Sequence, residues 1–175
     1  MTTTHEYRAP ALIAELVSKY VPRDARILDA GAGTGLSGEV LAAAGYGDLV
    51  AMDLSEGMLE VARSKGVYKE ARRMALGEHL DFETGTFGAM VAVGVFTQAH
   101  APASAFDELV RVTRPGGHVA FTLSVPSYEG AGFKEKFAEL ESAGKWKLTD
   151  LTGPQQLTQG GAGVEHQAWV WEVAS

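Results

Sequence analysis

A glycine-rich segment near the start of the chain lies between two acidic residues that could contact the same ligand. Residues 31–35 read GAGTG, directly after Asp29 and Ala30, and Asp53 ends the next apolar run. Glycine lets the backbone approach a ligand closely, and a helix that begins there offers unpaired N–H groups to a polar or anionic group. A carboxylate at the end of the following strand can accept hydrogen bonds from both hydroxyls of a ribose. This spacing predicts a site for an adenosine-containing cofactor.

Two classes of adenosine-containing cofactor fit such a segment. A nicotinamide dinucleotide fold requires the pattern G-x-G-x-x-G, which Gly33, Gly35 and Gly38 supply. That match begins late relative to the preceding strand, and it leaves Asp29 where a dinucleotide fold usually has an apolar or small residue. An acidic residue followed by G-x-G-x-G is instead similar to the first motif of the class I S-adenosylmethionine-dependent methyltransferases. The resemblance favours S-adenosylmethionine over a nicotinamide cofactor.

The resemblance to this superfamily extends over roughly residues 7–173. Residues 27–35 are similar to its first motif, and residues 52–59 to its second-strand motif, in which the acid holds the ribose and a Leu and a Met flank the adenine. Residues 76–78 fall where the family places an acidic residue near the adenine amino group. Residues 109–117 look like the helix and turn that precede the family's fifth strand.

This resemblance implies a set of contacts for the cofactor. We expect S-adenosylmethionine to be bound by Asp29, Gly31, Ala32, Gly33, Gly35, Asp53, Leu54, Met58, Leu76, Gly77, Glu78, Val95 and Tyr7. His100 lies just beyond the fourth apolar strand, where it could take a proton from an oxygen or nitrogen acceptor. The remaining histidines lack ligand-like spacing, so no metal site is expected. The expected reaction is methyl transfer by in-line displacement, which leaves S-adenosylhomocysteine.

Two departures from the family pattern keep a second interpretation open. Within the superfamily, residues 7–10 and 65–68 resemble the methyltransferase-like group related to the Williams–Beuren region protein. Gly88, however, follows Phe87 where the family often has Asp, and residues 1–9 form only a short N-terminal segment or lid. The second interpretation is a cofactor-binding module without turnover, acting as a partner or a reduced scaffold.

Alternating helical and strand-like periodicity predicts the elements that position these residues. Helices are predicted over residues 10–20, 36–44 and 133–143, and also between residues 55 and 66 and between residues 102 and 114. Strands are predicted over residues 26–30, 49–53, 71–75, 87–95, 118–125, 146–151 and 166–173. Strands joined through helices form a parallel sheet covered on both faces. The expected fold is therefore α/β: a Rossmann-like three-layer sandwich in one domain, residues 1–175, whose seven-stranded, mostly parallel sheet ends in an antiparallel C-terminal hairpin.

Composition and charge narrow the class of acceptor. The 175 residues carry 15 Lys and Arg against 22 Asp and Glu, a net charge of −7, so nucleic acid is not an expected partner. The absence of cysteine excludes disulfides and cysteine nucleophiles. No apolar run approaches the roughly 18 residues of a membrane span, and no signal-peptide core is present. We expect a cytoplasmic protein with a small-molecule acceptor and no membrane partner; its oligomeric state stays open.

Overall fold

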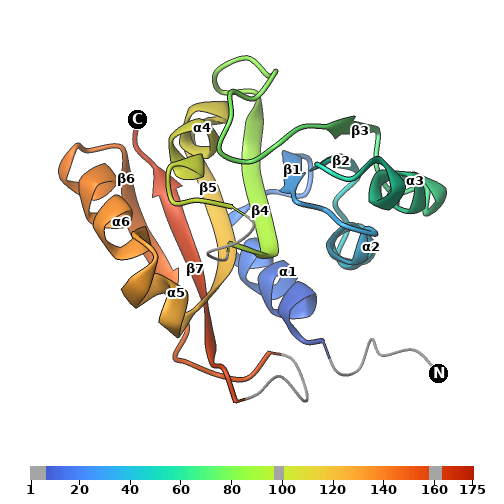
Figure 1. The fold of residues 1–175 in the computed structure, drawn as a ribbon. Coiled ribbons are helices and arrows are strands. Elements are labelled where there is room, and N and C mark those ends of the chain that lie inside the picture. Colours follow the sequence, from blue (N-terminus) through green and yellow to red (C-terminus); the bar gives the residue numbers. More distant parts are fainter. Residues whose placement is uncertain (1–6, 97–100, 158–162) are drawn as a thin grey trace.

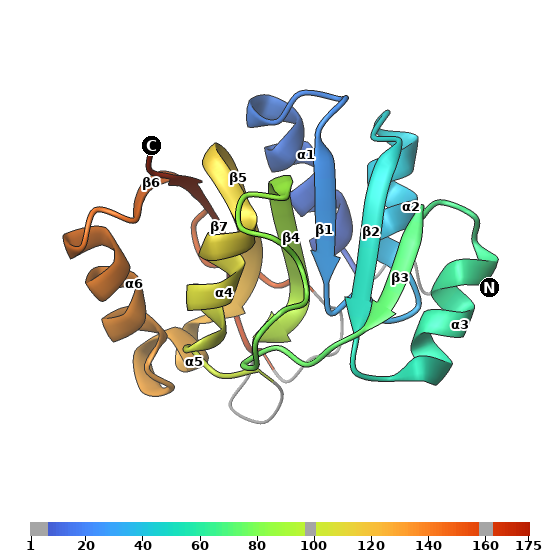
Figure 2. The same ribbon diagram turned by 90° about the horizontal axis from the view of Figure 1, so that it is seen from above.

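The computed structural model describes residues 7–96, 101–157 and 163–175. It contains a seven-stranded sheet in the order β3-β2-β1-β4-β5-β7-β6, with helices on both faces (Figure 1 and Figure 2). The strands are β1 (Arg26–Ala30), β2 (Asp48–Asp53), β3 (Glu70–Arg73), β4 (Phe87–Phe96), β5 (Thr113–Ser124), β6 (Trp146–Leu151) and β7 (His166–Val173). The helices are α1 (Ala9–Tyr20), α2 (Leu36–Ala43), α3 (Glu56–Ser64), α4 (Ala105–Val112), α5 (Val125–Gly130) and α6 (Phe133–Ser142).

The strand directions confirm the predicted mostly parallel sheet. Neighbouring strands from β3 to β5 are parallel, whereas β7 runs antiparallel between β5 and β6. The first strand, β1, lies between β2 and β4, so the direction of winding reverses at β1 and β4. In open α/β sheets, ligands bind beyond the carboxyl ends of the strands at such a reversal.

Side chains of the central strands alternate between two apolar cores. Ile27 belongs to the core that α1 and α2 cover, whereas the next residue, Leu28, belongs to the core beneath α4 and α6. The second core is rich in aromatic rings, and Trp146 of β6 stacks on Trp171 of β7 with 4.2 Å between ring centroids. Successive residues of a strand point to opposite faces, so a strand covered on both faces is apolar throughout. This explains why β4 is apolar throughout; in β1, Arg26 lies at the start of the strand and Asp29 is a buried exception.

The strand β5 begins earlier than the sequence predicts. Its first residue, Thr113, already pairs with Phe87, and regular pairing resumes with His118 opposite Ala89. The intervening Pro-Gly-Gly segment carries the sequence signature of a turn. Here it is accommodated as a bulge within the strand, which keeps the chain paired with β4 on both sides of the irregularity.

Smaller differences include the bounds of two elements and one additional helix. The strand β3 occupies Glu70–Arg73 instead of 71–75, and α4 begins at Ala105 because a turn closed by the Ala105 N–H and the Pro102 carbonyl precedes it. The helix α5 was not predicted. It has six residues with a proline in its first turn, which is too short to show helical periodicity in the sequence.

Candidate cofactor site

A cavity of about 430 Å³ opens at the carboxyl ends of β1, β2 and β4. Six of its lining residues were predicted from the sequence: Gly31, Asp53, Leu54, Met58, Leu76 and Val95. Four others were missed, namely Met52, Met74, Ala75 and Gly94. Met52, Ala75 and Gly94 each adjoin a predicted residue along the chain, and Met74 lies two positions before Leu76, so the motifs did not show which neighbours also face the cavity. Small-molecule sites commonly occupy roughly 300–1,000 Å³.

One wall of the cavity is apolar and partly open to solvent. Leu54 is 62% exposed and Met58 is 46% exposed, although both are large apolar side chains. Ser55 fixes this wall because its hydroxyl accepts a hydrogen bond from the Met58 N–H at 3.2 Å and caps α3. Apolar side chains at the edge of a concave site can cover a flat ring such as adenine.

The Asp53 carboxylate is held in place by two backbone N–H groups. Its Oδ2 accepts a hydrogen bond from the Gly33 N–H at 2.9 Å, and its Oδ1 accepts one from the Ser55 N–H at 2.9 Å. An ionised carboxylate has about four acceptor positions, so both oxygens keep capacity for a ligand. The carboxylate is thus oriented at the cavity and can accept hydrogen bonds from two neighbouring hydroxyls.

Gly31 lets the backbone enter the cavity wall. Its φ is +72°, in the left-handed region, and a Cβ built there would lie 2.6 Å from Cγ2 of Val95. The N–H groups of Gly31 and Ala32 donate to the carbonyl of Met52 at 2.9 and 3.0 Å, which anchors the turn to the end of β2. Only glycine satisfies both the backbone conformation and the close approach to β4.

Asp29 lies immediately behind this turn and is buried, with 1% of its surface exposed. Its Oδ2 accepts a hydrogen bond from the Tyr68 hydroxyl at 2.6 Å. Burial raises the pKa of the Asp29 carboxyl from 3.8 to about 6; the Tyr68 hydrogen bond opposes that rise, and the nearby Asp53 charge adds to it. At neutral pH, Asp29 is therefore still mostly a carboxylate, buried beside the cavity that Asp53 lines.

The other predicted residues have different positions. Ala32 and Gly35 belong to the turn without lining the cavity, and Gly77 and Glu78 are exposed beyond Leu76. Tyr7 reaches the edge of the cavity, because its hydroxyl oxygen lies 2.5 Å from the position that a Cβ on Gly94 would occupy. His100 lies outside the described residues, so its predicted role as a base stays a prediction.

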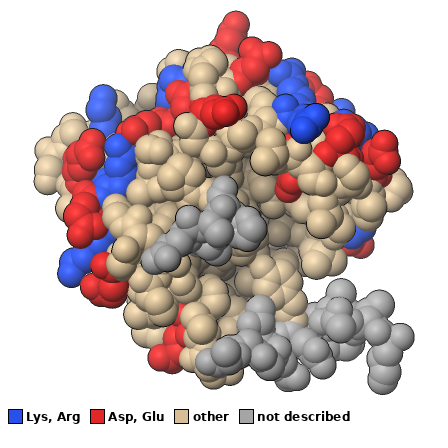
Figure 3. Space-filling view, viewed as in Figure 1, with Lys and Arg blue, Asp and Glu red and all other residues tan. Residues whose placement is uncertain are grey.

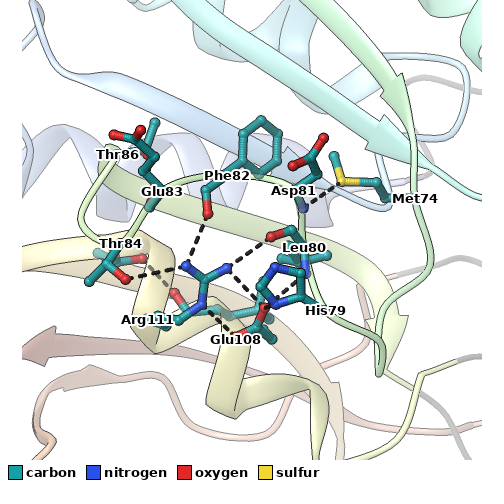
Figure 4. A network of polar contacts seen from close by, with 12 residues as sticks. Met74, His79, Leu80, Asp81, Phe82, Glu83, Thr84, Thr86, Glu108 and Arg111 are labelled. Atoms are coloured by element: carbon teal, nitrogen blue, oxygen red, sulfur yellow. Dashed lines mark hydrogen bonds and ion pairs between the residues drawn. The ribbon is translucent and has the colours of Figure 1, made fainter.

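An ion-paired cluster supports the segment that carries Met74 and Leu76 (Figure 4). The Arg111 guanidinium on α4 donates to the carbonyls of Leu80 and Phe82 at 2.9 and 3.0 Å. Glu108 accepts from Arg111 at 2.6 Å and from the Leu80 N–H at 2.8 Å. The hydrogen bond from Arg111 lowers the pKa of Glu108 to about 2, although burial opposes the shift. The sequence does not reveal this role of Glu108 and Arg111, because backbone acceptors leave no sequence signature.

Gly88 lies far from the cavity, near the amino end of β4. A Cβ at this position would meet the Cβ of Ala25 at 3.1 Å and the Arg114 guanidinium at 3.3 Å. Local packing against these two residues accounts for the glycine. This departure from the family pattern therefore does not alter the lining of the cavity.

Known proteins resemble this chain in sequence and in fold. Residues 28–121 match the family described as methyltransferase domain. Human methyltransferase-like protein 27 is 35% identical over 177 residues, which cover 97% of this chain and 71% of that protein. A demethylmenaquinone methyltransferase of Clavibacter sepedonicus is 38% identical over 96 residues, which cover 54% of this chain and 39% of that protein. A solved SAM-dependent methyltransferase structure from Methanosarcina mazei shares the fold, with a TM-score of 0.75 and 15% identity over 91% of this chain and 97% of the other.

Among the helices of residues 7–96, 101–157 and 163–175, none is long and apolar enough to cross a membrane. The same ranges hold no group of three or more His, Asp or Glu side chains that could bind a metal ion.

Proposed function

The chain belongs to the class I S-adenosylmethionine-dependent methyltransferases, and from this premise we propose that it methylates a small-molecule acceptor by in-line displacement. The observation that carries the proposal is the Asp53 carboxylate, fixed by the Gly33 and Ser55 N–H groups at the edge of an apolar cavity. When bound, S-adenosylmethionine supplies a methyl group that its sulfonium makes reactive. The protein then needs mainly to align the donor with the acceptor and to exclude water.

The residues at the cavity fit the parts of this cofactor. We assign the ribose hydroxyls to Asp53 and the adenine ring to the apolar wall that Leu54, Met58 and Leu76 form. We assign the amino-acid part of the donor to the backbone at Gly31, which lines the cavity beside Val95. Asp29 places a negative charge behind this turn, where it favours the donor's ammonium group.

A small acceptor agrees with the charge of the chain. The net charge of −7 opposes binding of a polyanion. On the face drawn in Figure 3, blue and red side chains intermingle around the periphery of the described residues instead of forming a continuous basic surface. The demethylmenaquinone methyltransferase named above acts on a small molecule by its name, which supports the same acceptor class here.

Ligand-induced stabilisation tests the cofactor assignment. S-adenosylhomocysteine at a hundredfold excess over its dissociation constant should stabilise the folded protein by about 2.7 kcal/mol, whereas NADH should not. Asp53→Asn should weaken S-adenosylhomocysteine binding by about one to two orders of magnitude in calorimetry, because hydrogen bonds to a charged group are lost. Asp48→Asn, at the opposite end of β2, is the matched control and should bind normally. Stabilisation by NADH alone would support a dinucleotide site instead.

Turnover needs a separate measurement because a module without turnover would also bind the cofactor. We expect mass spectrometry to detect a methylated product when S-adenosylmethionine is supplied with a panel of small phenols, carboxylic acids and amines. Cofactor binding without any methylated product across such a panel would favour the second interpretation, a binding module.

A further inference from the structure

Tyr68 and its neighbours in the chain contact β1, β2 and α2, although Tyr68 lies on none of the strands or helices. It stands between α3 and β3, where the Lys69 N–H donates to the Leu49 carbonyl at 2.8 Å. Lys65, just before it, pairs with Glu39 of α2 at 2.6 Å. The backbone on both sides of Tyr68 is therefore tied to β2 and α2, which fixes where the phenol ring can reach.

The phenol ring fills the space that two glycines leave open at the start of α2. A Cβ on Gly38 would lie 2.2 Å from the Tyr68 hydroxyl oxygen, and a Cβ on Gly35 would lie 3.2 Å from its Cε2. Gly38 does not have a positive φ, so backbone conformation is not the reason for this glycine. The last glycine of the late G-x-G-x-x-G pattern, Gly38, is thus explained by room for a tyrosine, whereas Gly33 and Gly35 have positive φ angles.

The hydroxyl of Tyr68 makes a side-chain hydrogen bond to Asp29, with 2.6 Å between the oxygens. Within the described part of the chain, no other side chain donates a hydrogen bond to the Asp29 carboxylate. The Tyr68 hydroxyl engages its Oδ2. A carboxylate held at one oxygen cannot rotate freely, so its other oxygen keeps a fixed direction. Hydrogen bonds to a charged acceptor are about twice as strong as those between neutral groups.

We propose that Tyr68 is a positioning residue for cofactor binding: its hydroxyl orients the Asp29 carboxylate toward the ammonium group of the donor's amino-acid part. The inference rests on the proposed function, because it requires that Asp29 faces the donor. Tyr68 itself does not contact the reacting atoms in this assignment. It acts through Asp29 and through the first turn of α2.

The same contact keeps Asp29 charged. Burial favours the neutral acid, the Asp53 carboxylate on β2 also favours it, and the Tyr68 hydroxyl favours the carboxylate. The charge of Glu39 on α2 also acts on the phenol of Tyr68, and Glu39 is paired with Lys65. Removal of the hydroxyl should therefore raise the pKa of Asp29 from about 6 toward neutrality.

The test compares S-adenosylhomocysteine binding to wild type and Tyr68→Phe across pH 5.5 to 8.5 by calorimetry. The variant keeps the ring that packs against Gly38 and loses only the hydroxyl. We expect its affinity to be about tenfold weaker near pH 7 and the pH at which binding declines to move upward by about one unit. A purely structural role for the hydroxyl would lower the melting temperature without moving that pH.

Tyr46→Phe is the matched control. Tyr46 is buried and its hydroxyl donates to the Val21 carbonyl at 2.7 Å, in the core that α1 and α2 cover. We expect this variant to lose stability while its affinity and pH dependence stay those of the wild type. In an Asp29→Asn background, Tyr68→Phe should have little further effect on binding, since the residue acts through Asp29.

The outcomes separate the inference from the proposed function. Wild-type affinity and an unchanged pH dependence in folded Tyr68→Phe would overturn the positioning role and leave the cofactor site intact. Failure of the wild type itself to bind S-adenosylhomocysteine would instead overturn the proposed function. Gly38→Ala gives a second route if Tyr68→Phe does not fold, because its methyl group must displace the hydroxyl and should weaken binding in the same direction.

Discussion

At the scale of single residues, burial of the Asp29 carboxylate lowers the stability of the fold at neutral pH and places a negative charge beside the cofactor site. The Asp29 pKa of about 6 lies above the 3.8 of an exposed aspartate, chiefly because burial disfavours the charge. The folded protein therefore holds this proton more tightly than the unfolded chain does. The protonated Asp29 therefore adds to the free energy of unfolding. This added stability is fully present below about pH 4 and is lost as the pH rises through 6. A shift of two units corresponds to roughly 3 kcal/mol.

Asp29→Asn should raise the free energy of unfolding at alkaline pH and weaken cofactor binding. The amide oxygen can still accept the Tyr68 hydroxyl, and the penalty for a buried charge disappears. We expect urea unfolding at pH 8 to give the variant a higher free energy of unfolding than the wild type, by up to roughly 3 kcal/mol. Its affinity for S-adenosylhomocysteine should fall. If the wild type and the variant show the same pH dependence of stability between pH 4 and 6, Asp29 does not titrate as described.

At the scale of elements, α4 supports the cavity without lining it. Arg111 and Glu108 hold the backbone at Leu80 and Phe82, and the preceding residues, Met74 and Leu76, form part of the cavity wall. The helix thus anchors the loop that directly follows this part of the wall. A charge-assisted fork to two carbonyls fixes a loop more firmly than a single neutral hydrogen bond.

Arg111→Gln should loosen this wall. Loss of the fork should lower the free energy of unfolding by about 2 kcal/mol, and amide hydrogen exchange over residues 74–86 should become faster. S-adenosylhomocysteine affinity should fall severalfold as a consequence. Lys147→Gln removes the exposed pair with Glu172 and should change stability by no more than about 0.5 kcal/mol. Unchanged exchange over the loop in Arg111→Gln would contradict the supporting role of α4.

Elements with strong periodicity could be predicted from the sequence, and contacts between distant segments could not. The strand β4 is apolar throughout and a glycine-rich turn follows β1, so both strands were located correctly. The Tyr68 hydroxyl and Asp29 are 39 positions apart, and their contact depends on how α2 and α3 pack. The fork from Arg111 ends on backbone carbonyls, which every residue carries. Such features appear only once the chain is folded.

At the scale of the whole molecule, Tyr7 and Arg8 lie beside both the cavity and the loop that contains Leu157. The Arg8 N–H donates to the carbonyl of Leu157 at 2.8 Å, and the hydroxyl of Tyr7 approaches Gly94 at the end of β4. Burial raises the pKa of the Tyr7 hydroxyl, so this phenol stays neutral at physiological pH. Tyr7 is therefore placed to form part of the lid that was predicted for residues 1–9.

Tyr7→Ala tests the lid without removing backbone. The truncated side chain should leave the melting temperature of the cofactor-free protein nearly unchanged, because one partly exposed ring close to a chain end contributes little to the cores. We expect weaker S-adenosylhomocysteine binding and faster ligand dissociation in stopped-flow measurements, since an aromatic wall beside the cavity is lost. Arg8→Ala is the control, as its exposed side chain is removed while the backbone bond to Leu157 is kept. Equal dissociation rates for both variants and the wild type would mean that the cavity is open on this side, and that residues 1–9 do not act as a lid.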